Sequence, residues 1–167
     1  THGHGHPRLM AAIRAQTELL DQVIFAGWTH EPAEAVASGL RAIMPENLTR
    51  VFFSDSGSTS VEVALKMALG FWAARGQGRH RIVVMQHSYH GDTIGAMSVG
   101  ARGVFNRSYG PLLFDVTTVP FPAAGSEQAT LDALERACAA AAAAFIVEPL
   151  VLGAGGMLVY SPEMLAR

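Results

Sequence analysis

Three short segments of the sequence contain residues that could bind an anion or flank a flat ligand. The first, residues 51–68, reads VFFSDSGSTSVEVALKMA: an apolar run, a Ser/Gly turn and then a helical pattern. A turn that opens a helix presents free N–H groups at the positive end of the helix dipole. Gly57 permits close backbone approach, and Ser56 and Ser58 add hydroxyl groups. The segment predicts an anion site, with a plain helix cap as the alternative.

The second segment, residues 88–93, reads SYHGDT and also follows an apolar run. Tyr89 could stack on a flat cofactor. His90 could act as a base, but a histidine beside Gly91-Asp92 more often fixes a turn. Because the carboxyl ends of parallel strands line a common crevice, we expect this segment to lie near the first one.

The third segment, residues 147–157, reads VEPLVLGAGGM. Glu148 ends an apolar run expected to be a strand, so its carboxylate is predicted to face the same crevice. A charge that faces solvent at the strand end is the alternative. Gly153, Gly155 and Gly156 predict a flexible loop.

Two further features invite a chemical interpretation. His2, His4 and His6 alternate and could share one face, but no Cys, Asp or Glu accompanies them, so a helix-entry loop is preferred to a metal site. Lys66 is the only lysine and could form a Schiff base. It follows Glu62 by four residues, however, and we interpret the two as an ion pair on the solvent side of a helix.

Composition narrows the classes of protein. The length of 167 residues fits about one domain, and the net charge of -2 provides no basic surface for nucleic acid. The longest apolar run, Ala137–Val147, is too short for a membrane span, which needs about 20 residues. The single cysteine, Cys138, excludes an internal disulfide and fits the cytoplasm. It lies among alanines, and we expect it to be a small core residue.

Strands and helices alternate along the chain. Apolar runs predict strands at 51–53, 81–85, 114–119 and 144–147. Helical patterns cover 8–21, 32–43, 59–75, a short stretch ending near 99, and 127–142. Thr59 and Glu62 have the spacing of a capping box. The alternation predicts an α/β fold with a mostly parallel sheet flanked by helices.

The motifs SDSGSTSVEVALKMA, SYHGDTIGAMSVG and VEPLVLGAGGM, in this order and spacing, resemble those of class III pyridoxal-phosphate aminotransferases of fold type I. General members tend to read N-S-G-T-E-A and Y-H-G-R-T at the first two. The forms here are more similar to those of members that act in biotin synthesis, as are VIFAGWTHEPA at 23–33 and GPLLF at 110–114. The resemblance covers nearly the whole chain, although Ser88 stands where these enzymes usually have Gly.

The resemblance implies a fold, a cofactor and site residues. Residues 46–167 would form part of the three-layer, pyridoxal-phosphate-binding large domain, and residues 1–45 a helical segment at the contact of a homodimer. At the cofactor the resemblance implies Gly57 and Ser58 at the phosphate, and Tyr89 stacked near the pyridine ring and bordering the substrate pocket. It places Glu148 behind the residues that contact the pyridine ring, and Thr29-His30 close to the dimer interface.

The resemblance also implies an activity. It is the transfer of an amino group from S-adenosylmethionine to 8-amino-7-oxononanoate, which gives 7,8-diaminononanoate. The family's aldimine lysine and the aspartate that pairs with the pyridine nitrogen follow the position of Glu148, so we expect them beyond Arg167 and no catalytic residue within this chain. We therefore expect the chain to be a fragment. The alternatives are a class III enzyme acting on an ω-amino acid or diamine, and a non-catalytic module that binds a phosphorylated ligand.

Overall fold

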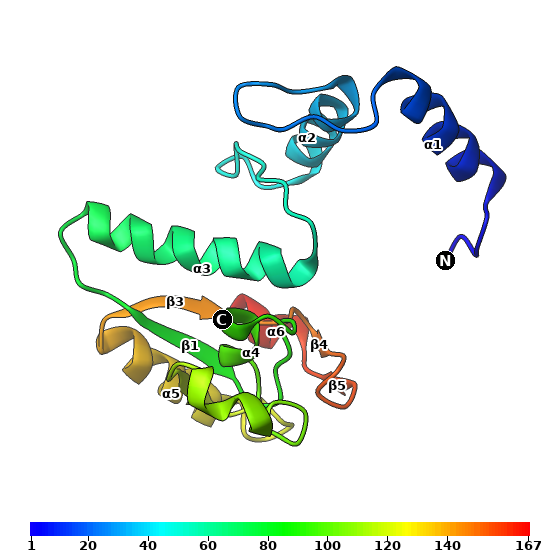
Figure 1. Cartoon of the computed structure of the whole chain (residues 1–167). Coiled ribbons are helices and arrows are strands. Elements are labelled where there is room, and N and C mark those ends of the chain that lie inside the picture. The colour runs from blue at the N-terminus through cyan, green and yellow to red at the C-terminus, as the bar shows by residue number, and fades with distance from the viewer. The chain divides into compact units, whose positions relative to one another are not determined.

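The computed structural model describes residues 1–167, which divide into two compact units, Thr1–Phe52 and Phe53–Arg167 (Figure 1). The helices are α1 (Pro7–Leu19), α2 (Glu31–Ile43), α3 (Gly57–Ala74), α4 (Ile94–Ser98), α5 (Glu127–Ala139) and α6 (Pro162–Ala166), with a 3-10 helix at Arg107–Leu112. The strands are β1 (Arg81–Met85), β2 (Thr117–Val119), β3 (Ala142–Ile146), β4 (Val151–Leu152) and β5 (Leu158–Val159). None of these helices combines the length and the apolar character that a bilayer crossing needs.

The first unit contains α1 and α2. Pro7 opens α1, and His6 is its N-cap. His30 caps α2 through its ring, whose Nδ1 accepts from the Ala33 amide at 3.3 Å. Ala33 is the one buried residue in the two helices, so α1 and α2 expose most of their side chains. A dimer-contact role for residues 1–45 stays a prediction.

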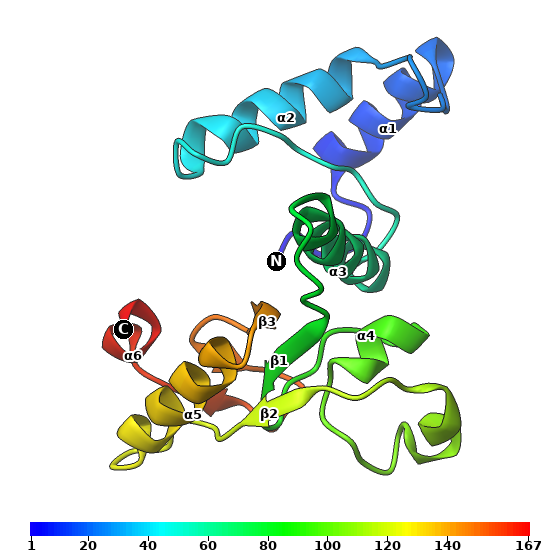
Figure 2. The same cartoon turned by 90° about the vertical axis from the view of Figure 1, so that its left-hand side faces the viewer.

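The second unit is built on a parallel sheet of order β2-β1-β3. Side chains of β1 alternate between its two faces. Ile82 and Val84 pack with Leu65 of α3, whereas Val83 packs with Ala137 of α5. Figure 2 shows α3 and α5 on opposite sides of the sheet. This three-layer arrangement confirms the predicted α/β fold with a parallel sheet flanked by helices.

Two predicted strands differ from the structure. Residues 51–53 are not a strand, because no strand of this chain pairs with them, and the Phe52 side chain is 64% exposed. The strand predicted at 114–119 is shortened to β2. The Phe114 amide donates to Ser98 Oγ at 3.1 Å, and the Phe114 carbonyl accepts from Arg102 at 2.7 Å. Side chains thus occupy the backbone groups that a strand partner would need.

The helix predicted at 59–75 begins earlier, and its cap differs. Ser56 is the N-cap of α3, and its capping box forms with Thr59, since each side chain accepts from the other residue's amide. The predicted box of Thr59 and Glu62 is therefore wrong. So is the ion pair of Glu62 with Lys66, because the Glu62 carboxylate turns toward α4 and accepts from the Gly95 amide at 2.7 Å.

The alanine-rich region also differs in detail. The helix predicted at 127–142 ends at Ala139, because Ala141 takes a φ of 60° and the chain turns into β3. Cys138 is exposed, so its predicted place in the core is wrong. Its neighbour Ala137 is the residue that faces the sheet.

We expect Leu65→Ala to lower the free energy of unfolding by about 2–5 kcal/mol, because the Leu65 side chain of α3 is only 8% exposed and packs against β1. The matched control is Leu112→Ala, at a side chain that is 65% exposed, with an expected cost below about 0.5 kcal/mol. Urea unfolding followed by circular dichroism measures both. Equal losses in the two variants would contradict the assigned core.

Candidate functional site

The loops that follow β1 and β3 meet at one edge of the sheet, and the start of α3 joins them. The Tyr89 amide donates to Glu148 Oε1 at 2.9 Å, which connects the two loops. The Asp92 amide donates to Ser58 Oγ at 3.0 Å, which connects the first loop to α3. The structure therefore brings together the three segments that the sequence singles out.

The first turn of α3 has the properties of an anion site. The amides of Ser56 and Thr59 bond within the capping box. The amides of Gly57 and Ser58 have no acceptor four residues earlier within the helix, as in any first turn. Apart from the adjacent residues and the backbone of the helix itself, no atom lies within 4 Å of the position that a Gly57 Cβ would take, so a ligand can reach this turn. The residues present thus fit a phosphate group.

Ser58 also holds the neighbouring loop. Its Oγ accepts the Asp92 amide, which leaves the hydroxyl hydrogen able to donate to a ligand. Gly91 lies against Ser58 with a φ of 131°, and a Cβ there would come within 2.9 Å of the Ser58 Cα. Glycine is therefore required at this contact for both space and conformation.

Tyr89 is 45% exposed and is fixed at both ends. Its amide is bound by Glu148, and its hydroxyl donates to Asp92 Oδ2 at 2.7 Å. The hydrogen bond to Asp92, with smaller effects of burial and of the Asp92 charge, raises the pKa of Tyr89. The ring is thus a neutral, oriented surface at neutral pH, suited to stacking on a flat ligand.

Glu148 joins the two loops with one carboxylate. Oε1 accepts from the Tyr89 amide, and Oε2 accepts from the Gly153 amide at 3.1 Å. The Glu148 carbonyl accepts from the Tyr160 hydroxyl at 2.8 Å. These bonds exclude the alternative of a charge that faces only solvent.

His90 is half-buried beside these groups. Burial lowers its pKa, and the nearby Glu148 carboxylate offsets part of this effect. The imidazole is therefore mainly neutral at pH 7. Its Nε2 is buried without a hydrogen-bond partner in this chain.

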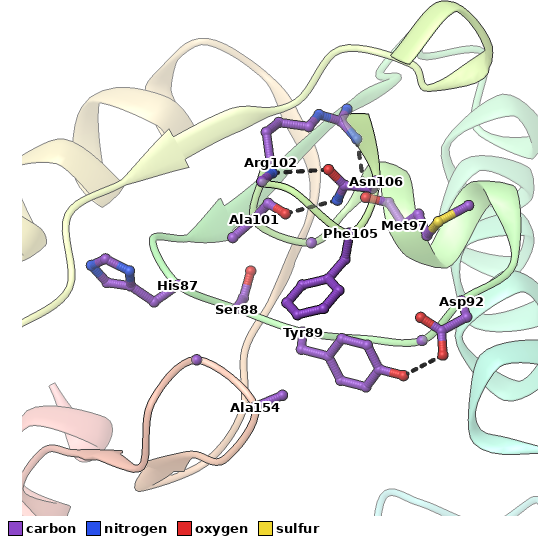
Figure 3. A pocket seen from close by; sticks show the side chains of 14 residues that line it. His87, Ser88, Tyr89, Asp92, Met97, Ala101, Arg102, Phe105, Asn106 and Ala154 are labelled. Atoms are coloured by element: carbon purple, nitrogen blue, oxygen red, sulfur yellow. Dashed lines mark hydrogen bonds between the residues drawn. The ribbon is translucent and has the colours of Figure 1, made fainter. Parts of the chain in front are cut away.

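A cavity of 530 Å³ opens beside Tyr89 (Figure 3). Tyr89 and Asp92 form one part of its wall, Phe105 and Arg102 another, and Ala154 lies across from them. Residues of the 100–106 loop also line this cavity, which was not predicted from the sequence. Their Gly- and Asn-containing composition was the available signal, but it indicates only a loop.

The family comparison covers the whole chain. The model of the family described as Aminotransferase class-III matches residues 1–167. The chain belongs to the class III aminotransferases. It is 52% identical to the adenosylmethionine-8-amino-7-oxononanoate aminotransferase of Synechococcus elongatus, with 99% of this chain and 41% of that protein aligned. The chain thus spans about two fifths of that relative's length.

Solved aminotransferase and transaminase structures agree with this assignment. The structure of the adenosylmethionine-8-amino-7-oxononanoate aminotransferase of Methanocaldococcus jannaschii superposes with a TM-score of 0.90 at 32% identity, over 98% of this chain and 37% of that one. A pyridoxal-phosphate-bound amine transaminase from an uncultivated Pseudomonas species gives 0.85 at 34% identity, over 94% and 39%. The chain therefore has the fold of part of these transaminases.

We expect Gly91→Ala to destabilise the protein by about 1–3 kcal/mol, because φ is 131° and the added Cβ would meet Ser58. Gly103→Ala is the control, since nothing lies within 4 Å of its Cβ position. Thermal unfolding of both variants checks this. A Gly91→Ala variant as stable as the control would show that Gly91 and Ser58 are not in contact.

The His90 pKa predicts a pH dependence of stability. Because the folded-state pKa of His90 lies below the ordinary histidine pKa of 6.5, the unfolded chain takes up a proton first as the pH falls. The contribution of His90 is present above about pH 6.5 and is lost as the pH falls through the folded-state pKa. Proton NMR titration of the His90 ring measures that pKa. A value at or above 6.5 would be inconsistent with the burial described.

Proposed function

We propose that the protein is a pyridoxal-phosphate-dependent aminotransferase of biotin biosynthesis. It would transfer an amino group from S-adenosylmethionine to 8-amino-7-oxononanoate and give 7,8-diaminononanoate. Support for these substrates comes from the name of the Synechococcus relative and its 52% identity over nearly all of this chain. Support for the cofactor comes from a single feature of the site, the open first turn of α3 beside a fixed aromatic ring.

Each site residue would have a separate task. The amides of Gly57 and Ser58 and the Ser58 hydroxyl would bind the phosphate group. The Tyr89 ring would cover one face of the pyridine ring and border the substrate pocket. Glu148 would keep the Tyr89 loop and the Gly153 loop at a fixed spacing.

When bound, pyridoxal phosphate supplies an electron sink for the carbanion that transamination requires. We propose that the residues described here bind and orient the cofactor and do not move the proton. Lys66 is exposed on α3, well beyond the first turn. We propose that the lysine of the site lies beyond Arg167, and that the enzyme is a homodimer with Thr29-His30 near the contact.

A second candidate is a class III aminotransferase that acts on another amine. The Pseudomonas amine transaminase favours it, because its 34% identity is similar to the 32% of the Methanocaldococcus enzyme. Steady-state assays of the protein expressed from its complete reading frame separate the two. We expect turnover with S-adenosylmethionine and 8-amino-7-oxononanoate. Turnover with β-alanine or ornithine as the amino donor and an oxo acid as the acceptor, without turnover of S-adenosylmethionine, would support the second candidate.

We expect Gly57→Val to weaken pyridoxal-phosphate binding by at least about tenfold, because its side chain would occupy the space over the free amides. The control is Gly78→Val, which also adds a side chain to open space but lies in the loop before β1. Cofactor retained after dialysis is read by absorbance. Full retention by Gly57→Val would contradict the phosphate assignment.

A further inference from the structure

Two side chains on one face of α3 bind the segment that follows Tyr89. Ser58 and Glu62 are four residues apart, so they are neighbours on the same side of the helix. Ser58 Oγ accepts the Asp92 amide at 3.0 Å. Glu62 Oε1 accepts both the Thr93 hydroxyl at 2.6 Å and the Gly95 amide at 2.7 Å. Three hydrogen bonds therefore connect α3 to residues 92–95.

Two glycines give this contact its close fit. Gly91 and Gly95 are also four residues apart, and each faces one of the two side chains. A Cβ on Gly91 would meet Ser58, and a Cβ on Gly95 would come within 2.6 Å of the Glu62 Cδ. The side chains of Ser58 and Glu62 thus pack directly against the glycine backbone of residues 91–95.

Glu62 provides the charged half of this connection. Thr93 is the N-cap residue of α4 but makes no capping bond, because its hydroxyl donates to Glu62 instead. The carboxylate replaces that cap by accepting from the Gly95 amide in the first turn. Hydrogen bonds to an ionised acceptor are stronger than neutral ones. Glu62 is therefore the main anchor between α3 and the start of α4.

The anchored segment in turn sets the position of Tyr89. Asp92, which lies directly before Thr93, accepts the Tyr89 hydroxyl at 2.7 Å. A movement of residues 92–95 away from α3 would carry Asp92 with it and release the ring. The first turn of α3 would keep its own amides in place, because they belong to the helix.

We propose that Glu62 is a positioning residue, which sets the distance between the phosphate-binding turn of α3 and the aromatic surface of Tyr89. This inference rests on the proposed function, since it assumes one ligand that uses both. It predicts that loss of Glu62 weakens binding of a ligand with a ring and a phosphate much more than binding of phosphate alone. A purely structural role would weaken both alike.

The test uses the protein expressed from its complete reading frame and two probes, pyridoxine 5′-phosphate and inorganic phosphate. Pyridoxine 5′-phosphate has no aldehyde, so binding does not depend on any lysine. For Glu62→Ala we expect about tenfold weaker binding of pyridoxine 5′-phosphate, equivalent to about 1.4 kcal/mol, and less than about a twofold change for phosphate. Glu62→Gln keeps an oxygen acceptor and should stay within about threefold of the parent protein.

A second variant pair tests the contact itself. Gly95→Ala should weaken pyridoxine 5′-phosphate binding in the parent protein, because its Cβ displaces the Glu62 carboxylate. In a Glu62→Ala background it should have little further effect. The effect of Gly95→Ala in this background is obtained by comparing the Glu62→Ala protein with the Glu62→Ala, Gly95→Ala double variant. Any loss of stability caused by Glu62→Ala is therefore common to both proteins.

The outcomes separate the two proposals. If the parent protein binds neither probe, the proposed function fails. If it binds both probes and Glu62→Ala changes the two affinities by the same factor, the positioning role is overturned. Independent, additive effects of Gly95→Ala and Glu62→Ala would overturn it as well.

Discussion

The parallel pairing of β1 with β3 is the constraint on which the rest of the site depends. Because the two strands run in the same direction, the loops that follow Met85 and Ile146 leave the sheet at one edge. Tyr89 and Glu148 are 59 residues apart in sequence, yet a single hydrogen bond connects them there. Without this register, Glu148 could not hold the Tyr89 loop, and the aromatic surface would have no fixed place.

Side chains bound to backbone amides provide the second level of organisation. Ser58, Glu62 and Glu148 each accept from an amide of a distant segment. Such bonds fix the backbone of a loop and leave the side chains of that loop free for a ligand. They also explain Gly91 and Gly95, since a Cβ on either residue would meet the Ser58 or the Glu62 side chain.

The sequence predicted the parts of the site that follow from local rules. The strand at 81–85 has an apolar, β-branched core, and the Ser56-Gly57 segment has turn-forming residues before a helical pattern, so both are predictable, although the prediction placed the capping box at Thr59 instead of Ser56. The three ligand segments were also predicted to meet, because parallel strands present their carboxyl ends together.

The features that were missed depend on tertiary contacts. The pairing of Glu62 with Gly95 could not be read from helix spacing, which favours Lys66 as its neighbour. Residues 51–53 have a strand composition but no strand beside them. The prediction for Cys138 is wrong by one residue, because its neighbour Ala137 packs against the sheet while Cys138 is exposed.

A crystal structure of the protein with pyridoxal phosphate tests the central claim most directly. The account predicts phosphate oxygens about 3 Å from the amide nitrogens of Gly57 and Ser58, with the pyridine ring against Tyr89. It would be contradicted by a cofactor phosphate bound away from the first turn of α3, or by a pyridine ring that makes no contact with Tyr89.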